Sequence, residues 1–217
     1  MTTLTTTPLA PLLDRLFEEA AAATSPAVAE LSAEERPLHS EQDRIPRFLR
    51  AAKGSLASVS RETGTLLYML ARSSGARTIV EFGTSFGIST LHLAAALRDN
   101  GGGRLITSEF EPSKVARARS NLTAGGLIDM VEIREGDALQ TLSVDLPETV
   151  DLLLLDGAKA LYPEVLTLVE SRLRPGALVV ADNADLCPEY LSRVRSTGSG
   201  YMSTPFGEDV ELSMRLG

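Results

Sequence analysis

The sequence predicts an α/β fold with a doubly wound, mostly parallel sheet that ends in an antiparallel hairpin. From residue 78 onward, five short apolar runs each precede a stretch of helical periodicity, the order that a parallel sheet with helices on both faces requires. Two runs, LLLL at 152–155 and ALVVA at 177–181, are apolar throughout, as expected of central strands buried on both faces. Residues 200–216 hold two strand-like pieces around a turn, so we expect seven strands.

The elements can be placed in order along the chain. Residues 9–23 form an apolar helical stripe, 24–47 have weak periodicity typical of a short helix and a loop, and 61–73 form a second helix. The predicted strands are then 78–82, 104–110, 130–135, 150–156 and 177–182, each followed by a helix, at 89–100, 112–126, 136–142, 162–173 and 188–196. Gly-Gly turns and Pro175-Gly176 are expected to separate these units.

Composition excludes several classes of protein. With 43% hydrophobic and 23% charged residues, the 217-residue chain is typical of a globular protein of one to two domains. Its net charge of −8 disfavours general binding of nucleic acid or anionic membranes. The single cysteine, Cys187, excludes an internal disulfide and is expected to be a packing residue. No stretch is long and apolar enough to span a membrane, and the N-terminus does not resemble a secretion signal, so we expect a cytoplasmic protein.

A glycine turn follows the first predicted strand. Gly83 and Gly87 bound the loop GTSFG, where a backbone without side chains can approach a ligand ahead of a helix N-terminus that favours anions. Glu109, at the end of the second strand, can accept hydrogen bonds from both hydroxyls of a ribose. The loop therefore predicts a nucleotide-like cofactor, although a tight turn without a ligand is the alternative. The GxxxG spacing differs from the GxGxxG of dinucleotide enzymes and weighs against NAD.

Acidic residues end the fourth and fifth apolar runs. Asp156 ends one and Asp182-Asn183 end the other, and neighbouring strands would lie about 4.8 Å apart. Two carboxylates that close repel each other, and a hard divalent cation such as Mg²⁺ relieves the repulsion by accepting carboxylate and amide oxygens. The alternative is that both aspartates only cap the following helices.

The order of these parts resembles the class I S-adenosylmethionine-dependent methyltransferases, which have a Rossmann-like sheet and a glycine loop E-x-G-x-x-x-G, here Glu81 to Gly87. Asp156-Gly157-Ala158-Lys159 and Asp182-Asn183 are similar to the D-x-x-K and D-N pair of the metal-dependent O-methyltransferases related to catechol and caffeoyl-CoA methyltransferases. The resemblance covers roughly residues 55 to 217. It implies an N-terminal helical extension and lid at 1–55 and a methyltransferase domain at 56–217.

The resemblance also implies an activity and its residues. A methyl group would pass from S-adenosylmethionine to a hydroxyl of a small catechol-like or hydroxylated aromatic acceptor, and the protein would be a homodimer. Asp156, Asp182 and Asn183 would bind Mg²⁺ or another divalent cation, leaving sites for two vicinal oxygens, and Lys159 would act as the base beside Asp156. The residues implied for the cofactor are Val59, Glu81, Gly83, Thr84, Ser85, Gly87, Ser89, Glu109, Asp137, Ala138 and Asp156.

Other interpretations stay open at this point. The same scaffold could methylate a hydroxylated uridine of tRNA, could bind the cofactor without catalysis, or, least in keeping with GxxxG, could be an NAD-dependent dehydrogenase. Neither Glu208 nor Asp209 aligns with the acidic residue that holds the second hydroxyl in catechol enzymes. His92, between two leucines, is expected to be structural.

Several further side chains have two possible roles. The loop that carries His39, Arg44 and Arg47 could cover the acceptor or be solvated, and Tyr162 and Tyr201 could line the pocket or the core.

Overall fold

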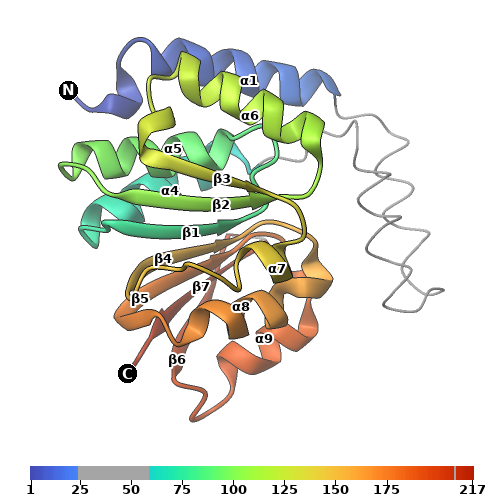
Figure 1. Cartoon of the computed structure of the whole chain (residues 1–217). Coiled ribbons are helices and arrows are strands. Elements are labelled where there is room, and N and C mark those ends of the chain that lie inside the picture. Colours follow the sequence, from blue (N-terminus) through green and yellow to red (C-terminus); the bar gives the residue numbers. More distant parts are fainter. Residues whose placement is uncertain (24–58, 208) are drawn as a thin grey trace.

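The computed structural model describes residues 1–23, 59–207 and 209–217, and it confirms the predicted fold class (Figure 1). One seven-stranded sheet has the order β3-β2-β1-β4-β5-β7-β6, in which β1 to β5 pair in parallel and β6 and β7 are antiparallel. The strands are β1 (Thr78–Phe82), β2 (Arg104–Glu109), β3 (Val131–Glu135), β4 (Val150–Leu155), β5 (Leu173–Ala181), β6 (Tyr201–Phe206) and β7 (Val210–Arg215).

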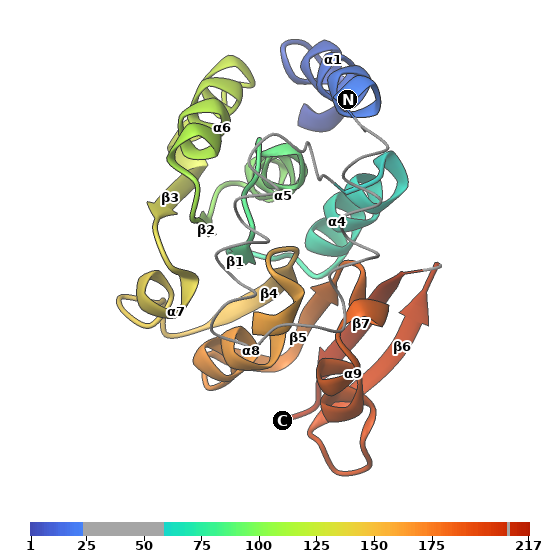
Figure 2. The same ribbon diagram turned by 90° about the vertical axis from the view of Figure 1, so that its right-hand side faces the viewer.

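Helices cover both faces of the sheet. The α-helices of the described residues are α1 (Leu9–Ala23), α4 (Arg61–Ser73), α5 (Ile88–Asp99), α6 (Pro112–Ala124), α7 (Ala138–Thr141), α8 (Tyr162–Glu170) and α9 (Pro188–Arg195). Helices α4, α5 and α6 lie on one face with α1 outside them, and α7, α8 and α9 lie on the other (Figure 2). Strand β4 alternates between the two cores, with Leu152 and Leu154 in the first and Leu153 and Leu155 in the second. This alternation explains why its sequence is apolar throughout.

The fifth strand begins earlier than predicted. β5 starts at Leu173 rather than at 177, so Pro175-Gly176 lie inside a strand and the prediction of a turn there was wrong. Val150 pairs with Leu173 and Leu152 with Leu178, so residues 174–177 lie opposite a single residue of β4. The strand accommodates the Pro-Gly pair as a bulge, a position at which a missing N–H and a glycine are tolerated.

The described part of the N-terminal extension packs on the main domain. Leu9, Leu12, Leu13 and Leu16 of α1 are buried in the same core as α5 and α6. Residues 24–58 are not described, so the predicted boundary at 55, the lid, and His39, Arg44 and Arg47 all lie outside the described residues. Among the described helices, none has the length and apolar character needed to cross a bilayer.

His92 lies inside the core of the helical face. Its side chain is 3% exposed, and its Nδ1 lies 2.8 Å from the carbonyl oxygen of Ile88, one turn earlier in α5. The ring contacts the edge of Phe17 and leaves no space for a Cβ at Gly64, which would lie 2.7 Å from the imidazole. These contacts join α1, α4 and α5 and support the structural role that the sequence predicted.

Burial of His92 should make stability depend on pH. Burial lowers the pKa of His92 from its usual 6.5 to about 4, so between these values the unfolded state binds a proton that the folded state does not. The free energy of unfolding should therefore fall as the pH drops from about 6.5 to about 4, by up to about 3 kcal/mol from this residue. Urea unfolding at a series of pH values measures this slope.

The control is His92→Gln, which stays neutral over the same range. Carboxyl groups titrate alike in both proteins, so the difference between the two pH profiles isolates the imidazole. Identical profiles would contradict the prediction.

Candidate active site

The order of the strands reverses between β1 and β4, which is where open α/β sheets bind ligands at their carboxyl ends. Gly83 follows β1 and Asp156 follows β4 at this point. The N–H of Asp156 donates to the carbonyl of Phe82 over 2.8 Å. Gly83 has a φ of +101°, and a Cβ there would overlap the backbone carbonyl of Asp156. The predicted cofactor loop and the first of the predicted metal ligands are therefore in direct backbone contact.

Hydrogen bonds hold the glycine loop against β2. The N–H groups of Gly83 and Thr84 donate to the carbonyl of Ser108, at 3.1 and 3.2 Å. The Thr84 side chain is 1% exposed and its hydroxyl bonds to Thr107 at 2.6 Å, so Thr84 can meet a ligand only through its backbone. Gly87 also has a positive φ, of +85°, just before α5. The loop thus presents a fixed backbone surface at the switch point.

Glu109 is pre-positioned by backbone donors. Its two oxygens accept one N–H each, from Ser85 at 2.8 Å and from Glu111 at 2.9 Å. Each carboxylate oxygen keeps a second lone pair, which suits a pair of ribose hydroxyls. The N–H of Gly136 donates to the backbone carbonyl of Glu109 at 2.9 Å, which brings the turn before Ala138 beside it. Asp137 in this turn has a structural task too, because its carboxylate caps α7 at Leu139.

Glu81 and Ser89 lie behind the loop. The Ser89 hydroxyl donates to one carboxylate oxygen of Glu81 and the Thr90 hydroxyl to the other, both at 2.6 Å. Burial raises the pKa of Glu81, whose side chain is fully buried. These bonds fix the first turn of α5. Cofactor contacts by Glu81, Ser89 and Val59, which is 2% exposed, remain predictions.

The two predicted acidic strand ends meet. Leu155 pairs with Ala181 in the parallel β4–β5 ladder, so Asp156 and Asp182 follow at adjacent positions and their carboxyl groups influence each other's ionisation. Burial raises the pKa of both groups, and together with the charge of Asp156 it brings Asp182 to about 7. Neither residue caps a helix: the one-turn helices that follow, Lys159–Leu161 and Ala184–Leu186, have no side-chain cap. The capping interpretation is wrong.

Lys159 lies beside the acid pair. Its Nζ lies 3.3 Å from Oδ1 of Asp156 and 5.3 Å from the ring centre of Tyr162. The Tyr162 hydroxyl donates to the backbone carbonyl of Asp182 at 2.8 Å, so this one side chain contacts both Lys159 and Asp182. Tyr162 and Tyr201 both belong to the core of this face, and the Tyr201 hydroxyl donates to Glu170. Sequence reasoning left both tyrosines open; the signal for Tyr162 is its position three residues after Lys159, on the same turn.

The predicted metal ligands can provide a hard oxygen donor set. No group of three or more His, Cys, Asp and Glu side chains suitable for a metal occurs in the part of the chain that the structure describes. A cation at Asp156 and Asp182 would therefore need the amide oxygen of Asn183. Asn183 directly follows Asp182 in a left-handed conformation, with φ 48° and ψ 43°. Two carboxylates and an amide are ligands that Mg²⁺ accepts, so the residues fit the predicted ion.

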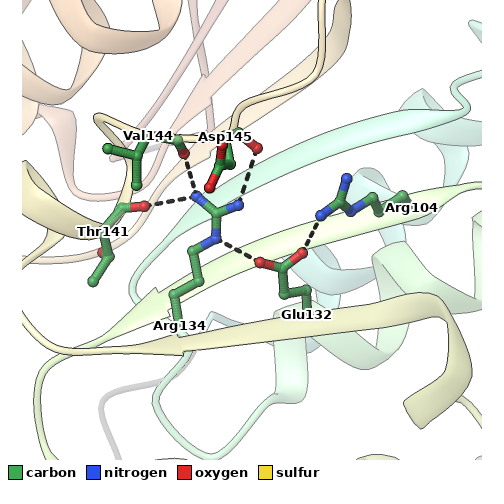
Figure 3. Close-up of a pocket in the computed structure, with 6 residues that line it drawn as sticks. All are labelled: Arg104, Glu132, Arg134, Thr141, Val144 and Asp145. Carbon is green, nitrogen blue, oxygen red and sulfur yellow. Dashed lines mark hydrogen bonds and ion pairs between the residues drawn. The ribbon is translucent and has the colours of Figure 1, made fainter.

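A separate hollow lies away from these residues. It is lined by Arg104, Glu132, Arg134, Thr141, Val144 and Asp145 (Figure 3). Arg134 donates to Glu132 and to three carbonyls at and beyond the end of α7, and Glu132 also pairs with Arg104. The guanidinium therefore holds α7 to the edge of the sheet, and these bonds account for the charges in the hollow without a ligand.

The chain is similar to O-methyltransferases. A family model described as a methyltransferase domain matches residues 80–184. The catechol O-methyltransferase of Niastella koreensis is 39% identical over 145 residues, which cover 62% of this chain and 65% of that protein. The catechol O-methyltransferase of Mycobacterium tuberculosis is 35% identical over 133 residues, covering 61% and 60%. The match thus spans less than two thirds of the length of these relatives.

A solved structure supports the same relationship. The O-methyltransferase from Streptomyces achromogenes involved in tomaymycin synthesis, in complex with S-adenosylmethionine, superposes with a TM-score of 0.65 at 28% identity. The superposition covers 88% of this chain and 96% of that one.

The contact between Gly83 and Asp156 predicts the effect of a single methyl group. Gly83→Ala should lower the free energy of unfolding by about 3 kcal/mol, because it combines a positive φ with an overlap against backbone. It should also weaken S-adenosylmethionine binding by about tenfold or more, since the loop must move away from Asp156. Urea unfolding and titration calorimetry measure the two effects.

Gly75→Ala is the matched control. Gly75 also has a positive φ, of +64°, but no atom within 4 Å of an added Cβ, so its cost should stay near the 1–2 kcal/mol of the backbone alone. Cofactor binding should be unchanged in this control. Equal costs at the two positions would show that the contact with Asp156 is not tight.

Proposed function

We propose that the chain methylates a hydroxyl of a small catechol-like or hydroxylated aromatic acceptor. It belongs to the class I S-adenosylmethionine-dependent methyltransferases, the family of the catechol and caffeoyl-CoA O-methyltransferases. One observation carries the proposal: the glycine loop touches the backbone of Asp156, which lies beside Asp182 in the β4–β5 register. A methyl donor on the loop and a hydroxyl at the acid pair would meet at one edge of the sheet.

The cofactor would lie along the carboxyl ends of β1, β2 and β3. Glu109 would hold the ribose, because its carboxylate is already oriented by two backbone donors. Asp137 and Ala138 would border the adenine, and the backbone from Gly83 to Gly87 would contact the amino-acid part. Glu81 and Ser89 would support this part from behind, where they already bond to each other.

A divalent cation would be held by Asp156, Asp182 and Asn183. The raised pKa of both carboxyl groups supports this assignment, since each is poorly compensated as an anion and two positive charges at that place would favour both anions. Such a cation supplies Lewis acidity, which lowers the pKa of a hydroxyl that it coordinates. We favour Mg²⁺ because the donors are all oxygens.

Residues of the chain itself would move the proton and align the reactants. Lys159 would have to be a neutral amine when the acceptor is bound, and its Nζ would then receive the proton of the acceptor hydroxyl from its position beside Asp156. The acceptor oxygen would then bond to the methyl carbon as the carbon–sulfur bond breaks, and the electron pair would stay on sulfur in S-adenosylhomocysteine. Holding the oxygen and the methyl group near attack distance can contribute several kcal/mol. The N-terminal helical extension and lid predicted at 1–55, and a homodimer, remain part of this proposal.

The first test is a panel of acceptors with S-adenosylmethionine. We expect methyl transfer to vicinal dihydroxy aromatics in Mg²⁺, a fall of about 100-fold in excess EDTA, and recovery when Mg²⁺ is restored. Monohydroxy analogues should react more slowly, because they offer one oxygen where the acid pair has room for two. Product analysis by mass spectrometry gives the rates and the position of the new methyl group.

Two results would contradict different parts of this function. An unchanged rate in EDTA would remove the metal and leave the methyltransferase. Calorimetry that detects binding of NAD but not of S-adenosylmethionine would overturn the proposed activity itself.

The second test addresses Lys159. Lys159→Met should reduce kcat by about 10²- to 10⁴-fold, because the acceptor loses its base, and should leave S-adenosylmethionine affinity within about twofold. Lys159→Arg is the matched variant: it keeps a positive charge beside Asp156, but a guanidinium does not give up its proton. Both variants should lose kcat. Activity retained by Lys159→Arg would mean that Lys159 acts through charge alone.

A further inference from the structure

The closing hairpin brings an acidic residue to Asn183. Strands β5 and β7 are antiparallel, with Leu178 opposite Met214 and Ala181 opposite Glu211. The same register, continued two residues beyond β5, places Asn183 opposite Asp209. The N–H of Ala184 donates to the backbone carbonyl of Asp209 at 2.8 Å, which anchors the start of β7 beside Asn183.

The side chains of this pair also bond. Nδ2 of Asn183 donates to Oδ2 of Asp209 at 2.9 Å. A carboxylate can only accept hydrogen bonds, so it pairs with the NH₂ group of the amide and not with its oxygen. The oxygen of the planar amide then lies on the opposite arm, away from Asp209. A rotation of the amide by 180° would break this bond and exchange the two arms.

We propose that Asp209 is a positioning residue, which holds the Asn183 amide so that its oxygen, and not its nitrogen, is available to a divalent cation at Asp156 and Asp182. The inference rests on the proposed function, because it presupposes that cation. Asp209 is exposed and its carboxylate is engaged by Asn183, so it acts through the amide rather than as a ligand. Partners that orient a metal ligand typically change metal affinity by about 10- to 100-fold when they are removed.

The experiment measures binding of Mn²⁺ through the loss of the free-ion signal in electron paramagnetic resonance, on the intact chain without acceptor. We compare the wild type with Asp209→Ala, Asn183→Ala and the double variant. Asp209→Ala should weaken binding about tenfold. In the Asn183→Ala background the same change should have less than about a twofold effect, because the amide through which Asp209 acts is gone.

Asp185→Ala is the matched control for charge. Asp185 is an exposed carboxylate two residues from Asn183, and its removal should change Mn²⁺ affinity by less than about twofold. A loss in Asp185→Ala as large as in Asp209→Ala would overturn the inference. So would an equal loss from Asp209→Ala in the presence and absence of Asn183, since both results would mean that charge alone is responsible.

A second readout needs no metal. In NMR spectra of the metal-free protein, the Asn183 side-chain amide protons should exchange slowly with water in the wild type and rapidly in Asp209→Ala. Rapid exchange in the wild type would overturn the inference while leaving the proposed function intact, provided that Mn²⁺ still binds. If the wild type binds no Mn²⁺, the proposed cation site fails and the inference fails with it. Thermal unfolding midpoints within a few degrees of the wild type verify that each variant is folded.

Discussion

Two carboxyl groups that cannot easily ionise together, that of the buried Asp182 and that of the partly buried Asp156, are the constraint on which this site depends. The parallel register of β4 and β5 places Asp156 and Asp182 next to each other, because they directly follow the paired residues Leu155 and Ala181. Two negative charges in poor contact with water raise the free energy of the folded protein. The pKa of both carboxyl groups is raised for this reason. A protein retains such an arrangement where a positive partner compensates it, as Lys159 does in part from 3.3 Å.

Several contacts hold the backbone around the acid pair in place. The tyrosine ring below Lys159 fixes the carbonyl of Asp182, and Phe82 packs against that ring while its own carbonyl accepts the N–H of Asp156. Gly157 is required here because a Cβ would overlap the ring of Phe82. Contacts of the same kind join Gly83 to Asp156. The predicted cofactor loop and the acid pair are therefore in contact through their backbones.

The sequence was informative where local pattern and topology coincide. Alternation of strands and helices, the glycines after β1 and the acidic ends of β4 and β5 were all readable, since parallel strands bring their carboxyl ends to one edge. The bulge at Pro175-Gly176 could not be predicted from the sequence, because Pro-Gly is locally typical of a turn and it is the pairing with β4 that keeps these residues in a strand. Asp209 could not be assigned to Asn183 either. That contact depends on the register of β5 with β7, which is set by packing between segments that are not adjacent in sequence.

Charge at the site also restricts the class of ligand. Acidic side chains raise one another's pKa along the carboxyl ends of the strands. Burial is the main cause of the raised pKa of Glu81, and the charge of Glu109 adds to it. In the same way, the charge of Glu81 adds to the raised pKa of Asp156, and the charge of Asp209 to that of Asp182. Among the described residues, Lys159 is the cation that pairs with this row. A sulfonium and a divalent cation are both positive, so each would be attracted to the same edge. A polyanionic acceptor such as RNA would be repelled there, which together with the net charge of −8 favours a small aromatic acceptor over a tRNA base.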